Sequence, residues 1–197
     1  MDWTVTLRAS VLCLAVLLPA RTAVSQSTAA EVHGTARVGA HPAAHVVVWL
    51  EAPNLPPPTP HARVVLDQRN LSFSPRVLAV RVGTTVDFPN NDRVFHNVFS
   101  FKDGKRFDLG MYPVGSERRV LFDKPGLSRI FCNIHTNMAA YVMAVDTPYF
   151  AVSDETGAFV IPSVEPGAYM YHAWRAGGLE LVGPWTSGEP LVIKWQP

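Results

Sequence analysis

The sequence predicts an all-β protein, and this expectation rests on composition and on the spacing of apolar residues. The chain has 197 residues with 17 Pro, 13 Gly and a hydrophobic fraction of 48%, which is typical of a compact β protein rich in turns. Beyond residue 26, apolar side chains alternate in short runs, and no segment shows helical periodicity. Short alternating runs separated by Gly and Pro predict a β-sandwich.

The middle of the chain has the clearest strand pattern. Apolar residues alternate with other side chains in several short segments, and turns follow at Gly83 and at residues 123–126. We therefore expect strands at residues 78–82, 86–88, 120–122, 130–132 and 141–145.

A proline-rich segment precedes this block. Residues 53–60 contain five prolines, which excludes a central strand and indicates a loop or stiff linker. The apolar run at residues 45–50 lies before it, in a piece too small to bury a core alone. Further strands are expected after the central block, at residues 149–152, 158–161, 168–174 and 191–195.

The first 25 residues are typical of a secretory signal peptide. Arg8 precedes the apolar run 11–18, which is too short to span a bilayer as a helix. The small residues Ala23 and Ser25 predict cleavage before Gln26, and Ala20 marks an alternative site. No later stretch is long and apolar enough to cross a membrane, so we expect a soluble mature chain that is periplasmic or secreted.

Four residues carry metal-binding side chains at informative spacing. Cys132, His135 and Met138 are each separated by two residues, and His96 precedes the cysteine by 36 positions. Two imidazoles, one thiolate and one thioether form the ligand set of a blue-copper electron-transfer site, in which the methionine is a weak axial ligand. Zinc sites seldom use a thioether, and the chain lacks a CxxC pair. These residues therefore predict a site for one copper ion.

The predicted export supports the interpretation of Cys132 as a metal ligand. Cys132 is the only cysteine after the leader. An unpaired thiol is a liability in an oxidising compartment, and metal binding removes that liability. The alternative is a buried core cysteine at the end of a strand. The remaining histidines show no shared spacing and are expected on the surface or in loops: His33, His41, His45, His61 and His172.

The block from Leu66 to Asp146 resembles the cupredoxins of the plastocyanin and amicyanin type, and its Cys-x-x-His-x-x-Met loop is similar to the short loop of amicyanin. The resemblance implies a Greek-key β-sandwich in which His96 and His135 bind copper through imidazole nitrogen, Cys132 through a short bond and Met138 axially. It also implies that Asn97 links the two ligand loops by hydrogen bonds. Phe95 and Phe99 either limit the access of water to the ligand loop or belong to the core, and we expect them in the core.

The C-terminal part resembles a second kind of β-sandwich. The patterns Asp-x-x-Gly-x-Phe at 154–159 and Pro-Gly-x-Tyr at 166–169 are similar to the carboxypeptidase regulatory-like, transthyretin-type module. This resemblance implies that residues 32–52 and 148–196 form one small sandwich, with the copper domain inserted between them. The alternative is that the N-terminal strands extend the copper domain.

These expectations define a domain organisation. A signal peptide at 1–25 is followed by N-terminal strands and the linker at 26–60, a cupredoxin domain at 61–146 and a C-terminal sandwich segment at 147–197. The whole arrangement resembles exported plastocyanin-like proteins labelled methylamine utilization proteins, a label from which we take no substrate.

The function that follows is one-electron transport, with His135 as the ligand expected near the surface. The resemblance implies redox partners such as a cytochrome c or a periplasmic dehydrogenase. A net charge of +1 without a basic stripe excludes a nucleic-acid partner, and the absence of a catalytic triad, a phosphate loop or further copper ligands argues against an enzyme. Two alternatives remain: a copper delivery or storage protein, and a β-sandwich binding module with an incidental metal site.

Overall fold

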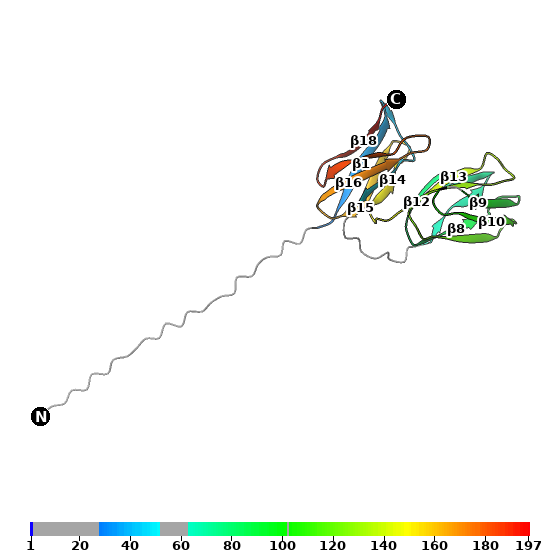
Figure 1. Ribbon diagram of the computed structural model, residues 1–197, viewed down its shortest axis with the longest axis horizontal. Helices are drawn as coiled ribbons and strands as arrows, with labels where there is room; N and C mark the ends of the chain where they lie inside the picture. The colour runs from blue at the N-terminus through cyan, green and yellow to red at the C-terminus, as the bar shows by residue number, and fades with distance from the viewer. Residues whose placement is uncertain (2–27, 52–62, 102) are drawn as a thin grey trace.

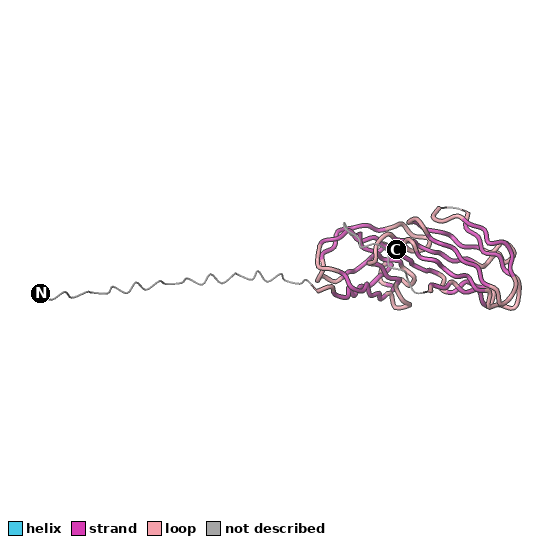
Figure 2. Tube along the Cα trace, turned by 90° about the horizontal axis from the view of Figure 1, so that it is seen from below, coloured by secondary structure: helices cyan, strands magenta, loops and turns pink. Residues whose placement is uncertain are grey.

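The computed structural model describes residue 1 and residues 28–51, 63–101 and 103–197. The expected leader after Met1 and the proline-rich segment 53–60 lie outside the described residues. All regular structure in the described residues is β-strand, so the all-β prediction is confirmed (Figure 2). No helix in this part of the chain has the length and hydrophobicity needed to span a membrane.

Residues 63–146 form a β-sandwich that we call the central sandwich (Figure 1). Its larger sheet contains, in spatial order, β10 (Phe107–Tyr112), β9 (His96–Ser100), β12 (Gly126–Phe131), β13 (Ala139–Val145) and β7 (Val77–Arg81). Its smaller sheet contains, in spatial order, β11 (Glu117–Phe122), β8 (Thr84–Pro89) and β4 (Val64–Val65). A short hairpin consists of β5 (Asp67–Arg69) and β6 (Ser72–Ser74).

Alternate residues of these strands fill one apolar core between the two sheets. The period of two along each strand sends every second side chain inward, which is the pattern on which the sequence prediction depends. The core contains Cys132 and Met138 among aromatic and aliphatic side chains such as Phe88, Phe122 and Ile130. Two of the four expected metal ligands are therefore held in a packed interior.

The remaining described residues, 28–51 and 147–197, form a second β-sandwich that we call the flanking sandwich. One of its sheets contains, in spatial order, β15 (Ala158–Val164), β1 (Ala30–Val38) and β18 (Leu191–Trp195), and β2 (His41–Pro42) pairs with β1. The other sheet contains, in spatial order, β14 (Phe150–Val152), β3 (Val47–Glu51), β16 (Ala168–Trp174) and β17 (Leu181–Thr186).

Strands from both ends of the chain alternate in each sheet of the flanking sandwich. β1 pairs antiparallel with β15 and parallel with β18, while β3 pairs antiparallel with β14 and β16. Figure 1 shows these blue strands interleaved with the orange and red ones. The two parts of the chain bury one shared core, which neither could form alone.

A glycine turn in the flanking sandwich explains the Asp-x-x-Gly pattern of the sequence. Asp154 Oδ1 accepts hydrogen bonds from the backbone N–H groups of Thr156 and Ala158 at 2.8 and 3.0 Å. Gly157 has φ of +78°, and a Cβ there would lie 2.4 Å from the carbonyl oxygen of Ala36. Both its conformation and its close approach to β1 require a residue without a side chain.

The two sandwiches pack against each other through a small apolar cluster. Met143 and Val145 of β13 contact Val47 of β3 in this cluster, while the alternate residues of β13 face the core of the central sandwich. At the same boundary, the rings of Tyr141 and Trp174 meet edge to face at 5.2 Å. β13 is therefore buried on both faces, which joins the flanking sandwich to the sheet that carries the expected metal ligands.

Candidate metal centre

The four expected ligands lie at one end of the larger sheet of the central sandwich. His96 is the first residue of β9, Cys132 follows the last residue of β12, and Met138 immediately precedes β13. β12 and β13 are hydrogen-bonded neighbours, so the loop that carries Cys132, His135 and Met138 is a short connection between paired strands. β9 pairs with β12 on the other side, which brings His96 next to this loop.

Three donor atoms meet at this end of the sheet. The Nδ1 atoms of His96 and His135 are 3.0 Å apart, and Cys132 Sγ lies 3.9 Å from the first and 3.7 Å from the second. Within the described residues, this is the group of His, Cys and acidic side chains whose ligand atoms lie close enough to hold a metal ion.

The size of this triangle suits a first-row transition metal. A point in the plane of the three atoms lies about 2.1 Å from each, close to ordinary metal–nitrogen and metal–sulfur bond lengths of roughly 2.0–2.3 Å. The donor types, one thiolate and two imidazoles in a plane, are those of a blue-copper centre. The residues present therefore fit copper in both size and chemistry.

Burial differs among the four residues in a way that matters for electron exchange. His96, Cys132 and Met138 are buried, whereas His135 is only half-buried. The backbone N–H of Met138 donates to the carbonyl oxygen of His135 at 2.9 Å, which closes the loop into a turn. One imidazole of the group is thus accessible from outside while the sulfur atoms are shielded from water.

A carboxylate fixes the orientation of His96. Asp92 Oδ2 lies 2.9 Å from Nε2 of the imidazole, so Nε2 donates its N–H outward and the lone pair of Nδ1 is directed toward Cys132 and His135. The backbone N–H of Leu71, with smaller contributions from the His96 ring and the N–H of Arg93, lowers the pKa of Asp92 to about 2 despite the opposing effect of desolvation. Asp92 is therefore ionised at neutral pH and remains an acceptor.

The buried Asn97 links three segments around the centre. Its Oδ1 accepts a hydrogen bond from the backbone N–H of Asn133 at 3.3 Å, and its Nδ2 donates to Asp108 Oδ1 at 2.8 Å. Asn133 follows Cys132 directly, so this side chain connects the loop of the second histidine to the strand of the first. Asp108, on β10, extends the network to the edge of the sheet.

The structure corrects two sequence expectations near the centre. Phe95 is 51% exposed rather than part of the core, and Phe99 is half-buried on the outer face of the sheet, where its ring stacks on Phe101 at 5.7 Å. Phe95 directly precedes β9 and lies on a loop, and the alternation of β9 directs Phe99 away from the core. The role of Asp92 was also missed, although an acid four residues before a candidate ligand was visible in the sequence.

His172 contradicts the expectation of a surface or loop histidine. Its side chain is 15% exposed, lies on β16 and forms hydrogen bonds with two glutamates of the flanking sandwich. It is remote in the chain from the candidate metal ligands and belongs to a different part of the molecule.

Comparisons with known proteins find solved structures that are similar over less than half of this chain. No protein-family model matches this chain, and no curated protein matches it either. Among solved structures, the copper-containing nitrite reductase NirK of Thermus scotoductus SA-01 is 27% identical, covers 43% of this chain and 22% of its own, and has a TM-score of 0.41. The chain thus spans about a fifth of the length of that protein.

Two smaller proteins are also similar. A purple cupredoxin from Nitrosopumilus maritimus is 26% identical, with a TM-score of 0.38, and the alignment covers 43% of this chain and 100% of that one. Amicyanin from Paracoccus versutus is 24% identical, with a TM-score of 0.39, and the alignment covers 44% of this chain and 85% of that one. All three alignments cover less than half of this chain.

Proposed function

We propose that this protein is an exported one-electron carrier whose central sandwich is a cupredoxin holding one copper ion. In this proposal His96 and His135 would hold the ion through Nδ1 and Cys132 through Sγ, and the thioether of Met138 would be a fourth, weaker ligand. The observation that carries the proposal is the triangle formed by the first three donor atoms, with edges of 3.0, 3.7 and 3.9 Å. When bound, copper supplies a couple between Cu(I) and Cu(II).

The protein's contribution is to hold the ligands in place during electron exchange. Asp92 orients the ring of His96, and Asn97 fixes the two ligand loops relative to each other. Cys132 and Met138 are embedded in the packed core, so their positions change little when the charge of the centre changes. A small structural change between the two oxidation states keeps electron exchange fast.

Electrons would enter and leave through His135, because it is the ligand that is not fully buried. Apolar residues precede both imidazole ligands in the chain: Phe95 is 51% exposed and Ile134 is 45% exposed. Exposed apolar residues beside a redox centre suit brief docking of a partner protein. We propose redox proteins such as a cytochrome c or a periplasmic dehydrogenase as partners.

The domain organisation is part of the proposal. Residues 1–25 would be removed on export to the periplasm or the exterior, and the cupredoxin domain at 61–146 would be inserted into a transthyretin-like module made from residues 32–52 and 147–197. The pairing of β1 with β15 and β18 supports this arrangement over an N-terminal extension of the copper domain.

Two measurements test the proposed function. The purified mature chain should bind one copper ion per molecule and give a reversible one-electron wave in voltammetry. A copper delivery protein would instead transfer its ion readily to a chelator or partner, which the burial of Cys132 and Met138 opposes. Copper binding without a reversible wave would favour storage or an incidental site over electron transport.

A further inference from the structure

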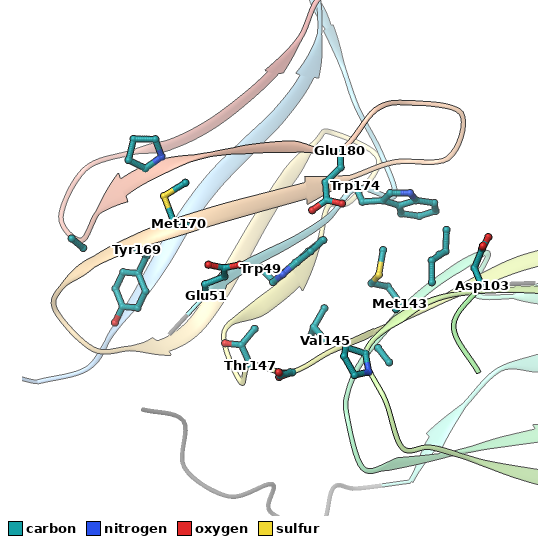
Figure 3. A pocket seen from close by; sticks show the side chains of 17 residues that line it. Trp49, Glu51, Asp103, Met143, Val145, Thr147, Tyr169, Met170, Trp174 and Glu180 are labelled. Carbon is teal, nitrogen blue, oxygen red and sulfur yellow. The ribbon is translucent and has the colours of Figure 1, made fainter. Parts of the chain in front are cut away.

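A groove of about 1030 Å³ lies between the two sandwiches (Figure 3). Trp49, Met170 and Glu180 of the flanking sandwich line one side, and Met143 and Val145 at the end of β13 line the other. Its volume is in the range of small-molecule sites, which often lie where two domains meet.

This groove is separate from the candidate metal centre. It reaches the central sandwich at the start of β12 and the end of β13, whereas the expected ligands lie at the opposite ends of these two strands. Leu127 in the groove precedes Cys132 by five residues of extended chain, which corresponds to about 17 Å. A ligand in the groove would therefore occupy a site that the proposed electron transport does not use.

Aromatic rings in fixed positions line the groove. The indole of Trp49 stacks on the ring of His172 with centroids 4.8 Å apart and an interplanar angle of 11°. Trp174 is held by its edge-to-face contact with Tyr141, and Tyr169 lines the far end. Rigid aromatic faces bind apolar groups and cations with little loss of side-chain entropy.

The polar part of the lining is acidic. Glu51, Asp103, Asp146 and Glu180 contribute carboxylates, and the described residues that line the groove include no Lys or Arg. His172 Nε2 lies 2.8 Å from Glu51 Oε1, and its Nδ1 lies 2.7 Å from Glu180 Oε1, so one ring positions both glutamates. The side chains of these two glutamates remain 62% and 43% exposed and can contact a ligand.

Two basic residues outside the lining lie against its carboxylates: His172, whose ring contacts both glutamates, and Arg129. Arg129 Nε lies 3.6 Å from Asp103 Oδ2. Asp146 forms no ion pair with any described residue. The groove therefore keeps a negative potential.

The two sandwiches also differ in overall charge. Residues 28–51 and 147–197 contain three Lys and Arg against seven Asp and Glu, whereas residues 63–146 contain twelve against eight. The opposite net charges of the two sandwiches nearly cancel in the formal charge of +1 for the whole chain. All the aromatic rings in the lining come from the acidic sandwich, so the charge of that wall favours a cation beside them, although the opposite wall belongs to the sandwich with net positive charge.

We propose that the groove binds a small organic cation that carries an apolar group, such as an aromatic ammonium compound. The apolar group would pack on Trp49, Trp174 and the two methionines, and the charged nitrogen would lie between the indole face and the glutamates. Four carboxylates give the lining a negative charge that an uncharged sugar does not use, so the lining favours a cation over a sugar.

The test is isothermal titration calorimetry of the metal-free full mature chain with benzyltrimethylammonium. Benzyl alcohol, benzoate and cellobiose serve as neutral, anionic and carbohydrate comparisons. We expect saturable binding of the cation at least about tenfold tighter than that of benzyl alcohol, and no binding of benzoate. Glu180→Gln should weaken cation binding several-fold, while the matched charge change Glu189→Gln, outside the groove on the same sandwich, should leave it unchanged.

Cys132→Ser distinguishes this proposal from the proposed electron transport, because it should abolish the copper centre and leave cation binding intact. Tighter binding of benzyl alcohol or cellobiose than of the cation would overturn the proposal. So would equal cation binding by the Glu180→Gln and wild-type proteins, or the absence of saturable binding at millimolar cation. None of these results would bear on the copper site.

Discussion

Asp92 and His96 are joined by a hydrogen bond of 2.9 Å between Oδ2 and Nε2, which leaves Nδ1 of the imidazole directed at Cys132 and His135. The same carboxylate accepts a hydrogen bond of 2.7 Å from the backbone N–H of Leu71, so a second segment of the chain also holds it in place. The first candidate ligand is therefore held in one tautomer and one orientation.

Removing the charge of Asp92 should weaken metal binding. Asp92→Asn places an amide where the carboxylate was, and the loss of a charge-assisted hydrogen bond makes His96 a poorer and less well-oriented ligand. Copper affinity should fall by about 10- to 100-fold, the usual effect of losing such a partner. Competition with a chelator of known affinity measures it. Asp123→Asn, which lies before β12 at the end of that strand opposite to Cys132, is the control, and equal affinity in both variants would contradict this role.

Replacing Met138 should change the reduction potential more than copper binding. Met138→Leu keeps an apolar side chain of similar volume in the core but removes the thioether. A weak axial donor stabilises Cu(II) more than Cu(I), so its loss should raise the potential while the blue colour persists. Voltammetry of the copper-loaded variant measures the shift. An unchanged potential would show that Met138 is not the axial ligand.

The contact between the two sandwiches should contribute to stability. Met143 is buried at this boundary, and Met143→Ala should lower the free energy of unfolding by about 2–5 kcal/mol through lost burial and a cavity. Met111→Ala, at a position that is 57% exposed, should change it by less than about 0.5 kcal/mol. Urea denaturation compares the two. Equal small losses would indicate that the sandwiches do not support each other.

Asp154 should make stability depend on pH in the acid range. The Thr156 side chain, assisted by backbone N–H groups of Ala158 and Thr156, lowers the pKa of Asp154 below its usual value of 3.8. A lowered folded-state pKa means that its stabilisation is fully present above the unfolded pKa and is lost as the pH falls through the folded pKa.

Asp154→Asn tests this dependence because it removes the titration and keeps an oxygen acceptor in the turn. The variant should be less stable than wild type at pH 7, and the difference should shrink as the pH falls below about 4. Denaturation at a series of pH values measures it. A difference that stays constant down to the most acid pH would show that the charge of Asp154 is not involved.

Local sequence patterns predicted the features that depend only on residues close together in the chain. Cys132, His135 and Met138 occur within seven residues, so a single turn between two strands brings them close together whatever the rest of the fold does. The strands around them could be predicted because one face of each packs on a single core. The Asp154 turn was also visible, since its glycine requirement is local.

Features that depend on contacts between distant segments could not be predicted. Met143 and Val145 alternate in the sequence as one apolar face of a strand, yet this face of β13 packs on the second sandwich, and the intervening residues face the core of the central one. His172 has no informative neighbours in sequence, because its partner Glu51 lies 121 residues away. Phe95 was expected in the core from hydrophobicity alone, but its loop position leaves it exposed. In each case the environment comes from tertiary packing rather than from the local pattern.

The visible and electron paramagnetic resonance spectra of the copper-loaded chain test the central claim most directly. The trigonal set of His96, His135 and Cys132 predicts an intense blue absorption and narrow copper hyperfine splitting, both arising from the thiolate bond. Cys132→Ser should lose the blue colour, because a hydroxyl cannot replace the thiolate. A colourless wild-type protein, or a Cys132→Ser variant that remains blue, would contradict the assignment of this centre.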